Sequence, residues 1–219
     1  MAVAQADLWE QWQEFPLEDA VATRSALTVA LTDTAHVYGE MAAGAGADWY
    51  VEARREAVPG RFSARLSVPV SAEQITVNAG WAVGPLFGVA QPETAFKRAS
   101  GVAQKLIANA DRATILGNIR RDPKAQRWSR GASANCCTFC AMLATRDNYR
   151  SESSAGFKAH GHCRCFPVPV WRGEAQQMPD YYDTFAQEYA DAVKAVDDLG
   201  ERRTPKTVLR EMRALSGRA

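Results

Sequence analysis

Residues 135–165 read NCCTFCAMLATRDNYRSESSAGFKAHGHCRC and hold all five cysteines of the 219-residue chain, together with two of its three histidines. A disulfide framework distributes its cysteines over the whole fold, and an odd number leaves one thiol over. The first residues, MAVAQADLWEQW, have neither the basic nor the apolar segment of a secretory signal, so we expect a reducing compartment. The cluster therefore indicates a metal site, a redox pair or buried thiols.

The cluster divides into two halves that match the ligand pattern of a zinc site. Cys137 and Cys140 form a C-x2-C pair, and twenty residues after it the chain reads HGHCRC. Tetrahedral zinc takes four nitrogen or sulfur ligands, which a C-x2-C followed by an H-x2-C supplies. We therefore expect Zn²⁺ in a closed, structural site that stabilises a small, loop-rich region. The candidate metal ligands are Cys137, Cys140, His160, Cys163 and Cys165.

The identity of the last ligand stays open at this point. Cys163 and Cys165 lie two residues apart, so in an extended chain they point to the same face and compete for one position. The H-x2-C spacing favours Cys163, whereas Cys165 has only its proximity. Cys136 is expected to be a buried thiol, and His162 is directly adjacent to Cys163, which disfavours both as ligands. A thioredoxin-like redox pair would require a βαβ context, and the sequence indicates none.

The rest of the chain is dominated by helical patterns. Apolar residues recur at spacings of three and four, and Pro16, the glycines at 44 and 46, and Gly200 interrupt them. Residues 62–70 fit either a short strand or an extended linker, and residues 72–90 are ambiguous because glycines and a proline weaken an apolar run. The expected helices cover 8–43 with a break at Pro16, 47–57, 92–110, 111–121, about 182–199 and 205–215.

A short sheet is expected on either side of the cysteines. Residues 127–129 resemble a strand, and residues 165–171 are extended, with two prolines that exclude a central strand but allow an edge strand. The fold class is therefore α+β, mostly α. We expect a helical N-terminal region at 1–91, a small zinc-stapled α+β domain with a short sheet at 92–175, and C-terminal helices at 176–219.

Charge is unevenly distributed although the net charge is only +1. Residues 1–60 contain ten acidic residues and three arginines, whereas residues 92–130 contain nine lysines and arginines and three acidic residues. A basic segment over 97–130 can contact packaged DNA or an acidic protein, although solvated helix faces produce the same pattern. No run of about eighteen apolar residues occurs, so we expect no membrane partner.

The cysteine motifs resemble those of phage head morphogenesis proteins of the Mu F type, a minor capsid family. That family carries C-x2-C, a gap, H-P-x-C-R-C and an extended segment. Here the corresponding residues are Cys137, Cys140, then His160 to Cys165, then Phe-Pro-Val-Pro-Val. The branch in actinobacteriophages is more similar still, with a Trp-Arg strand, C-x-F-C-A-M-L-A-x-R, a tyrosine, Gly-Phe and H-x-H-C-x-C. The departures are Gly161, where the wider family has proline, and the additional Cys136.

The resemblance is specific from about residue 110 to residue 171 and makes the 92–175 region a Mu F-like domain. It implies a zinc-containing head morphogenesis or minor capsid protein that associates with the portal protein and the major capsid or scaffolding protein. The implied location is the capsid interior of the virion, and the host cytoplasm during assembly. Some members of the actinobacteriophage branch are labelled capsid maturation protease, which makes proteolysis the first alternative function. A nucleic-acid-binding zinc module is the second.

The residues give little support to proteolysis. A serine protease needs a histidine to accept the proton of the serine, and the chain contains only His36, His160 and His162. His160 is a candidate metal ligand, and His36 lies in a helical pattern without a nucleophile motif beside it. A metalloprotease would need an open zinc position and a nearby glutamate base, and no H-E-x-x-H helix occurs. No catalytic residue is assigned.

Overall fold

The computed structural model describes residues 1–67, 70–145, 163, 165–173 and 178–218. It is mostly helical and contains one small antiparallel sheet, which confirms the expected α+β, mostly α fold class. The chain divides into two compact units. The helical unit comprises Met1–Glu56 and Gly60–Asn118, and the sheet unit comprises Ala57–Pro59 and the described residues from 119 onward. The predicted division at residues 91 and 175 stays a prediction.

Two helices begin the helical unit. Helix α1 (Ala2–Gln13) buries Ala4, Leu8 and Trp12, which are four residues apart and therefore lie on one face. Pro16 follows α1, as its missing N–H requires, and helix α2 (Ala20–Ala57) begins after Asp19. The Asp19 carboxylate accepts hydrogen bonds from the backbone N–H groups of residues 21 and 22, which caps the first turn of α2.

The predicted break at Gly44-Ala45-Gly46 is wrong, because α2 continues through it for 38 residues. The reason lies in tertiary packing. A Cβ atom on Gly46 would collide with the Asp111 carboxylate of another helix, and a Cβ on Gly39 would lie 3.6 Å from the Ala110 Cβ. These glycines permit two helix backbones to approach closely, and the packing outweighs the loss of about 1 kcal/mol in helix propensity at each glycine.

The segment that the sequence left ambiguous forms helix α3 (Ala72–Val83), followed by a single 3-10 turn, η1 (Gly84–Leu86). The Ser71 hydroxyl caps α3 by accepting from the N–H of Gln74. Helix α4 (Pro92–Arg121) is one element of 30 residues, which corrects the prediction of separate helices at 92–110 and 111–121. Residues 110 and 111 are alanine and aspartate, and neither residue ends a helix as proline does. Pro92 occupies the first position of α4, where proline is tolerated.

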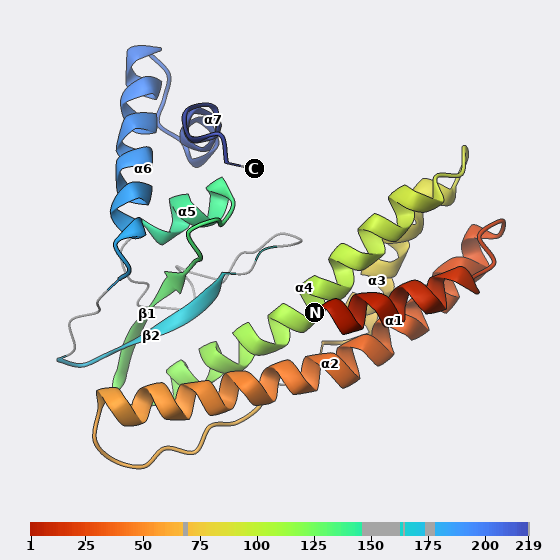
Figure 1. Cartoon of the computed structure of the whole chain (residues 1–219), viewed down its shortest axis with the longest axis horizontal. Coiled ribbons are helices and arrows are strands. Elements are labelled where there is room, and N and C mark those ends of the chain that lie inside the picture. Colours follow the sequence, from red (N-terminus) through yellow and green to blue (C-terminus); the bar gives the residue numbers. More distant parts are fainter. Residues whose placement is uncertain (68–69, 146–162, 164, 174–177, 219) are drawn as a thin grey trace. The chain divides into compact units, whose positions relative to one another are not determined.

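The core of the helical unit is formed by α1, α2, α3, η1 and α4 (Figure 1). It consists of aliphatic side chains and one tryptophan, all at most 9% exposed. Burying each large side chain contributes roughly 1.5–3 kcal/mol relative to exposure. The buried members are Leu8, Trp12, Leu27, Ala30, Leu31, Ile75, Ala79, Ala82, Val83, Leu86, Ala95, Ala99, Val102, Ala103 and Leu106.

The chain between α2 and α3 is an extended linker, and no strand is assigned in its described residues. Its backbone is held by polar side chains of α4. The Asn118 side chain accepts from the N–H of Arg65 at 2.9 Å and donates to the carbonyl of Arg65 at 2.9 Å. The Thr114 hydroxyl accepts from the N–H of Ser67 at 3.0 Å. Asn118 and Thr114 are buried, so these hydrogen bonds satisfy groups that would otherwise be desolvated without partners.

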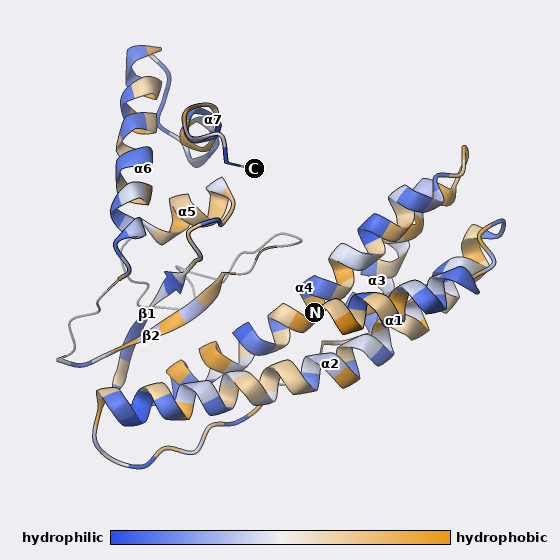
Figure 2. Ribbon diagram, in the orientation of Figure 1, coloured by the Kyte–Doolittle hydropathy of each residue, from blue (hydrophilic) through white to orange (hydrophobic). Residues whose placement is uncertain are grey.

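The sheet unit contains two antiparallel strands, β1 (Ala125–Gly131) and β2 (Phe166–Trp171). Figure 2 shows that β1 is largely polar and β2 largely apolar. Pro167 and Pro169 are two residues apart, so their missing N–H groups lie on the same edge of β2. That edge cannot donate to a further strand, which agrees with the predicted edge position.

Three helices complete the sheet unit: α5 (Thr138–Ala144), α6 (Tyr181–Asp198) and α7 (Pro205–Ser216). Helix α5 packs against β1, α6 and α7, and α6 packs against α7. The predicted ends of α6 and α7 are confirmed. Gly200 follows α6 with φ 67°, and Thr204 forms a capping box with Thr207 at the start of α7. The buried core is Ala132, Cys140, Ala141, Met142, Leu143, Cys165, Phe185, Ala192, Val196, Val208 and Met212.

Hydropathy separates these helices from membrane spans. Among the described residues, no helix combines the length and the apolar character that crossing a bilayer demands. The longest helix, α2, has length enough but carries acidic and basic residues along it.

Candidate metal centre

The first two sulfur ligands come from the start of α5. Cys137 is the N-cap residue, with φ −66° and ψ 157°, and Cys140 lies in the first turn of the helix. A change from extended to helical backbone at this point turns both side chains toward the same side. Cys140 is buried and Cys137 is partly buried. The C-x2-C spacing is therefore built on a helix N-terminus.

The second pair comes from the segment that leads into β2. The Sγ atom of Cys163 lies 3.8 Å from that of Cys137 and 3.5 Å from that of Cys140. The Sγ atom of Cys165 lies 3.2 Å from that of Cys140. The sulfur atoms of Cys137, Cys140 and Cys163 all lie within 4.8 Å of one another, and Cys165 adjoins this group through Cys140.

The separations among Cys137, Cys140 and Cys163 fit a tetrahedral metal site, whereas the 3.2 Å between the sulfurs of Cys140 and Cys165 is shorter than such a site requires. With zinc–sulfur bonds of about 2.3 Å, neighbouring sulfur ligands of a tetrahedral ion lie about 3.8 Å apart. The separations from Cys163 to Cys137 and Cys140, 3.8 and 3.5 Å, match this value closely. Thiolates are soft ligands that select zinc over magnesium or calcium. The cluster can therefore hold a metal ion.

The ionisation of these thiols depends on their neighbours. Hydrogen bonds with the other cysteines, first of all Cys137, raise the pKa of Cys140 far above its usual value, and burial adds to this effect. The pKa of Cys163 is raised chiefly by Cys137. Burial raises the pKa of Cys136 to about 11. Crowded thiolates repel one another, and a bound divalent cation reverses that repulsion, so metal binding and deprotonation are linked.

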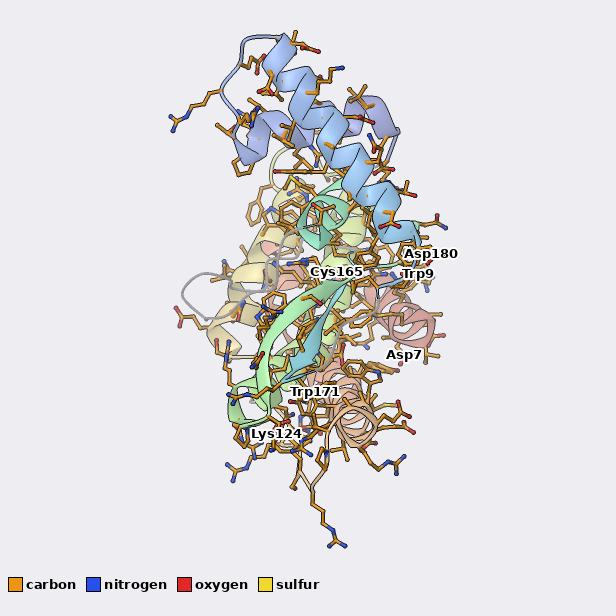
Figure 3. The ribbon with its side chains drawn as sticks, turned by 90° about the vertical axis from the view of Figure 1, so that its left-hand side faces the viewer. Asp7, Trp9, Lys124, Cys165, Trp171 and Asp180 are labelled. Atoms are coloured by element: carbon orange, nitrogen blue, oxygen red, sulfur yellow. The ribbon has the colours of Figure 1, made fainter. Side chains whose placement is uncertain are left out.

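A buried arginine adjoins the sulfur cluster. Arg130 of β1 is 2% exposed, and its Nη1 donates a hydrogen bond to the Cys165 Sγ at 2.8 Å. The β1 backbone at this point is held by Tyr182, whose hydroxyl donates to the Arg130 carbonyl and accepts from the N–H of Ala132. Burial raises the pKa of Tyr182 to about 12. Figure 3 labels Cys165 immediately before β2 and Trp171 at the other end of that strand.

A second polar contact holds the start of α5. The hydroxyl of Thr138, which follows Cys137 directly, donates to the carbonyl of Arg218 at 3.0 Å. The Arg218 guanidinium binds the Glu188 carboxylate of α6, donates to the carbonyl of Ala134 and lies over the Phe185 ring. The N-terminal turn that carries the C-x2-C pair is therefore fixed from two other segments of the sheet unit.

Four of the five predicted ligands lie together: Cys137, Cys140, Cys163 and Cys165. His160 lies outside the described residues, so its place in the ligand set stays a prediction. Cys136, expected to be a buried thiol, is partly buried against the core of the sheet unit. Sequence reasoning did not identify Arg130 as a site residue, because it counted this arginine among the basic residues of a charged segment.

The basic segment at 97–130 does not form one exposed strip. Arg112 and Arg130 are 3% and 2% exposed, and the Arg98 guanidinium lies over the Trp81 ring at 4.9 Å from its centroid. These three arginines serve packing within the protein. The exposed basic residues that remain, Lys97, Arg120, Arg121 and Lys124, are spread over α4 and the turn after it.

Comparison with known proteins gives one match. No curated protein and no solved structure matches the chain. A family model described as VG15 protein matches residues 1–192, which covers the helical unit and the sheet unit through most of α6. The chain therefore belongs to the VG15 family, a family of phage proteins.

Proposed function

We propose that the protein is a minor capsid or head morphogenesis component of a phage particle, stabilised by a structural zinc ion. The observation that carries the proposal is the VG15 family match over residues 1–192, which spans both compact units. The cysteine motifs that resemble those of the Mu F type support the same proposal, because that type of protein is a minor capsid family. The C-x2-C pair and the C-x-C pair carry this resemblance.

The proposed zinc ion has a structural role. The sulfur atoms that would bind it are buried or partly buried in the sheet unit, and Cys140 and Cys165 belong to its core. Four protein ligands fill a tetrahedral site and leave no position for a substrate or a reactive water. Zinc binding in such a site contributes directly to folding free energy. The ion would hold α5 against the segment entering β2.

The proposed partners are the portal protein and the major capsid or scaffolding protein, in the interior of the procapsid. Contact with packaged DNA through the basic segment is a secondary role, supported only by the exposed residues of that segment. The protease alternative finds little support in the described residues. His36 lies on α2 with its side chain 71% exposed, 3.0 Å from the Glu40 carboxylate, which is an ordinary surface pair.

Co-expression with the portal and major capsid proteins of the same phage tests the proposal. Three forms are compared: the wild type, Cys137→Ser/Cys140→Ser, and Cys136→Ser as a matched cysteine control. The measurements are zinc per chain, co-purification with portal or procapsids, and the mass of the capsid protein. We expect one zinc per chain and particle association for the wild type and the control, loss of both in the double variant, and an uncleaved capsid protein.

Two outcomes would contradict the proposal in different ways. Site-specific cleavage of the capsid protein that depends on this chain would establish the protease function instead. Absence of the wild-type chain from portal and procapsid fractions, at full zinc content, would exclude a head component while leaving the metal site intact.

A further inference from the structure

A groove lies on the helical unit between α2, α3 and α4, away from the cysteine cluster. Its volume is about 160 Å³, and all of the residues that line it belong to the helical unit. The α2 wall presents Gly39 and Ala43, and the α4 wall presents Val102, Leu106 and Ala110. The small residues leave the space between the two helices unfilled, so the groove has an apolar floor.

The size of the groove limits what it can hold. Pockets that bind cofactors or drug-sized molecules usually measure about 300–1,000 Å³. The groove is smaller, at about 160 Å³. A protein cavity of about 150 Å³ accepts one benzene molecule, which is the ring of a phenylalanine side chain. The groove therefore fits one aromatic or branched apolar side chain, the kind of residue that anchors a protein partner in a pocket.

Two charged side chains line the groove, Lys105 of α4 and Glu40 of α2. The Glu40 carboxylate lies 3.0 Å from Nδ1 of His36, and the Glu40 side chain is 54% exposed. Lys105 is partly buried, and its ammonium has no hydrogen bond or ion pair in the part of the chain that the structure describes. Solvent screens an exposed charge more than a partly buried one. The groove therefore favours an acidic group on its α4 side.

Amide side chains at the rim can bind a peptide backbone. The Asn78 amide donates through Nδ2 to the Gln74 carbonyl at 2.8 Å, which leaves its Oδ1 as an acceptor. The Asn109 Oδ1 accepts from Nη1 of Arg112 at 3.0 Å, which leaves its Nδ2 as a donor. Neither remaining amide atom has a partner among the described residues. An acceptor and a donor match the N–H and C=O groups of a peptide, which a hydrocarbon ligand lacks.

We infer that the groove is the docking site for an acidic segment of another phage head protein. The segment inserts one aromatic or branched apolar side chain over the apolar floor, and a neighbouring carboxylate pairs with Lys105. The identity of the partner as a head protein rests on the proposed function. The chemistry of the groove, an apolar anchor beside an acid, rests only on the residues that line it.

The chemistry is tested on the purified full chain with three blocked peptides: acetyl-Glu-Phe-Glu-amide, acetyl-Lys-Phe-Lys-amide and acetyl-Glu-Ala-Glu-amide. Methyl signals of Val70, Val102 and Leu106, which line the groove, report binding in NMR titrations. We expect the Glu-Phe-Glu peptide to bind most tightly. The alanine peptide should bind at least about tenfold more weakly, because it buries no ring. The lysine peptide should bind roughly 3–10-fold more weakly, because Lys105 repels it.

Charge reversal tests the role of Lys105. We expect Lys105→Glu to weaken binding of the Glu-Phe-Glu peptide roughly 3–10-fold and to make the Lys-Phe-Lys peptide the tighter ligand. Lys97→Glu is the matched control, because Lys97 is an exposed lysine of α4 that does not line the groove. It should leave the order of the three peptides unchanged.

Filling the groove tests its role in the particle. Ala113 lines the groove and is exposed, so Ala113→Trp can occupy the space without disturbing the core. We expect this variant to lose peptide binding at least about tenfold and to lose association with portal or procapsids in co-expression. Ala45→Trp is the control, because Ala45 is an exposed alanine of α2 outside the groove. It should behave as the wild type does.

The outcomes separate the groove from the proposed function. Unmoved groove signals, or equal binding of the three peptides, would overturn the chemistry of the groove. Full particle association in an Ala113→Trp chain that no longer binds peptide would overturn the docking role and leave the head function intact. Absence of the wild type from particles would remove the proposed function and the head partner, while the peptides judge the groove by themselves. A wild-type oligomer that Ala113→Trp dissociates would make a second copy the occupant and contradict the inference.

Discussion

The helical unit and the sheet unit build their buried cores from different residues. The helical unit brings fifteen buried apolar residues together from four helices and a 3-10 turn, and none of them is a cysteine. The sheet unit has eleven, of which two are cysteines, around a sheet of only two strands and a helix of seven residues. A two-stranded sheet is at best marginally stable by itself.

The difference indicates which part of the fold the proposed metal ion would stabilise. Small regions bury a smaller fraction of their surface and commonly depend on metals or disulfides. In the sheet unit the sulfur atoms belong to the core, so loss of the ion would leave repelling or unpaired thiols among apolar side chains. The helical unit has no such dependence among its core residues. The two units should therefore respond differently to the same perturbation.

Metal removal should have the largest effect. We expect a zinc chelator, or Cys137→Ser/Cys140→Ser, to unfold the sheet unit while the helical unit keeps its structure, since structural zinc contributes about 10 kcal/mol or more in small metal domains. Hydrogen exchange read by mass spectrometry checks this unit by unit. Equal loss of protection in α2 and in β1 would contradict the comparison, and retained protection in both would exclude a structural metal.

Truncation of a large, fully buried side chain in the sheet unit should come next. Phe185 is fully buried and contacts the rings of Tyr181 and Tyr182. Phe185→Ala should lower the unfolding free energy of the sheet unit by about 3–5 kcal/mol, because it leaves a large cavity. Denaturant unfolding followed by hydrogen exchange measures it. The effect should be confined to the sheet unit, and an equal loss in the helical unit would show that the units unfold together.

Two glycines of α2 test how much close helix packing contributes to the stability of the helical unit. Gly46→Leu should destabilise the helical unit by about 1–3 kcal/mol, because the new side chain collides with Asp111 and overpacks a close helix contact. Gly44→Leu is the matched control, since a Cβ at Gly44 meets nothing within 4 Å. It should raise stability by roughly 0.5–1 kcal/mol, because leucine has the higher helix propensity and its Cβ meets no neighbour. Thermal denaturation of both variants distinguishes tertiary packing from intrinsic helix propensity.

The Arg218 contact should have a smaller effect on the sheet unit. Its guanidinium binds the Glu188 carboxylate through Nε and Nη2 at 3.0 Å, and the two side chains are 19% and 18% exposed. Arg218→Ala should cost about 1 kcal/mol, near the upper end for partly exposed pairs with two-point geometry. A double-mutant cycle with Glu188→Ala measures the coupling. A coupling of zero would show that Arg218 acts through its other contacts, with the Ala134 carbonyl and the Phe185 ring.

The smallest effect concerns pH and the helical unit. Burial raises the pKa of the Asp111 carboxyl, and neighbouring Arg112 partly opposes this. A carboxyl with a raised folded-state pKa favours folding in its protonated form, so its contribution is present below the unfolded-state pKa and is lost as pH rises through the folded-state pKa. Asp111→Asn should therefore increase stability slightly at neutral pH and have less effect in acid. Urea midpoints across this range provide the measurement. A larger stabilisation in acid than at neutral pH would contradict a raised pKa of the Asp111 carboxyl.

Sequence reasoning succeeded where local chemistry decides the structure. The C-x2-C pair, the edge strand with Pro167 and Pro169, and the ends of α6 and α7 all follow from the residues at those positions. It failed where distant residues decide. The residues near Gly46 do not indicate that Asp111 packs over it, so a break was predicted where α2 is continuous. The residues near Arg130 do not indicate that it is buried beside a sulfur atom, because the sequence does not distinguish a buried arginine from an exposed one.

The linker that α4 holds has a consequence for the evolution of the family. Two residues of extended chain, from Arg65 to Ser67, advance about 6.6 Å, and the four helical residues from Thr114 to Asn118 span about 6.0 Å. The two repeats match, so each backbone group meets its own side chain on the helix. A one-residue insertion or deletion would shift one partner by about 3.3 Å and leave it unpaired. Relatives should therefore keep the number of residues between these two contacts unchanged.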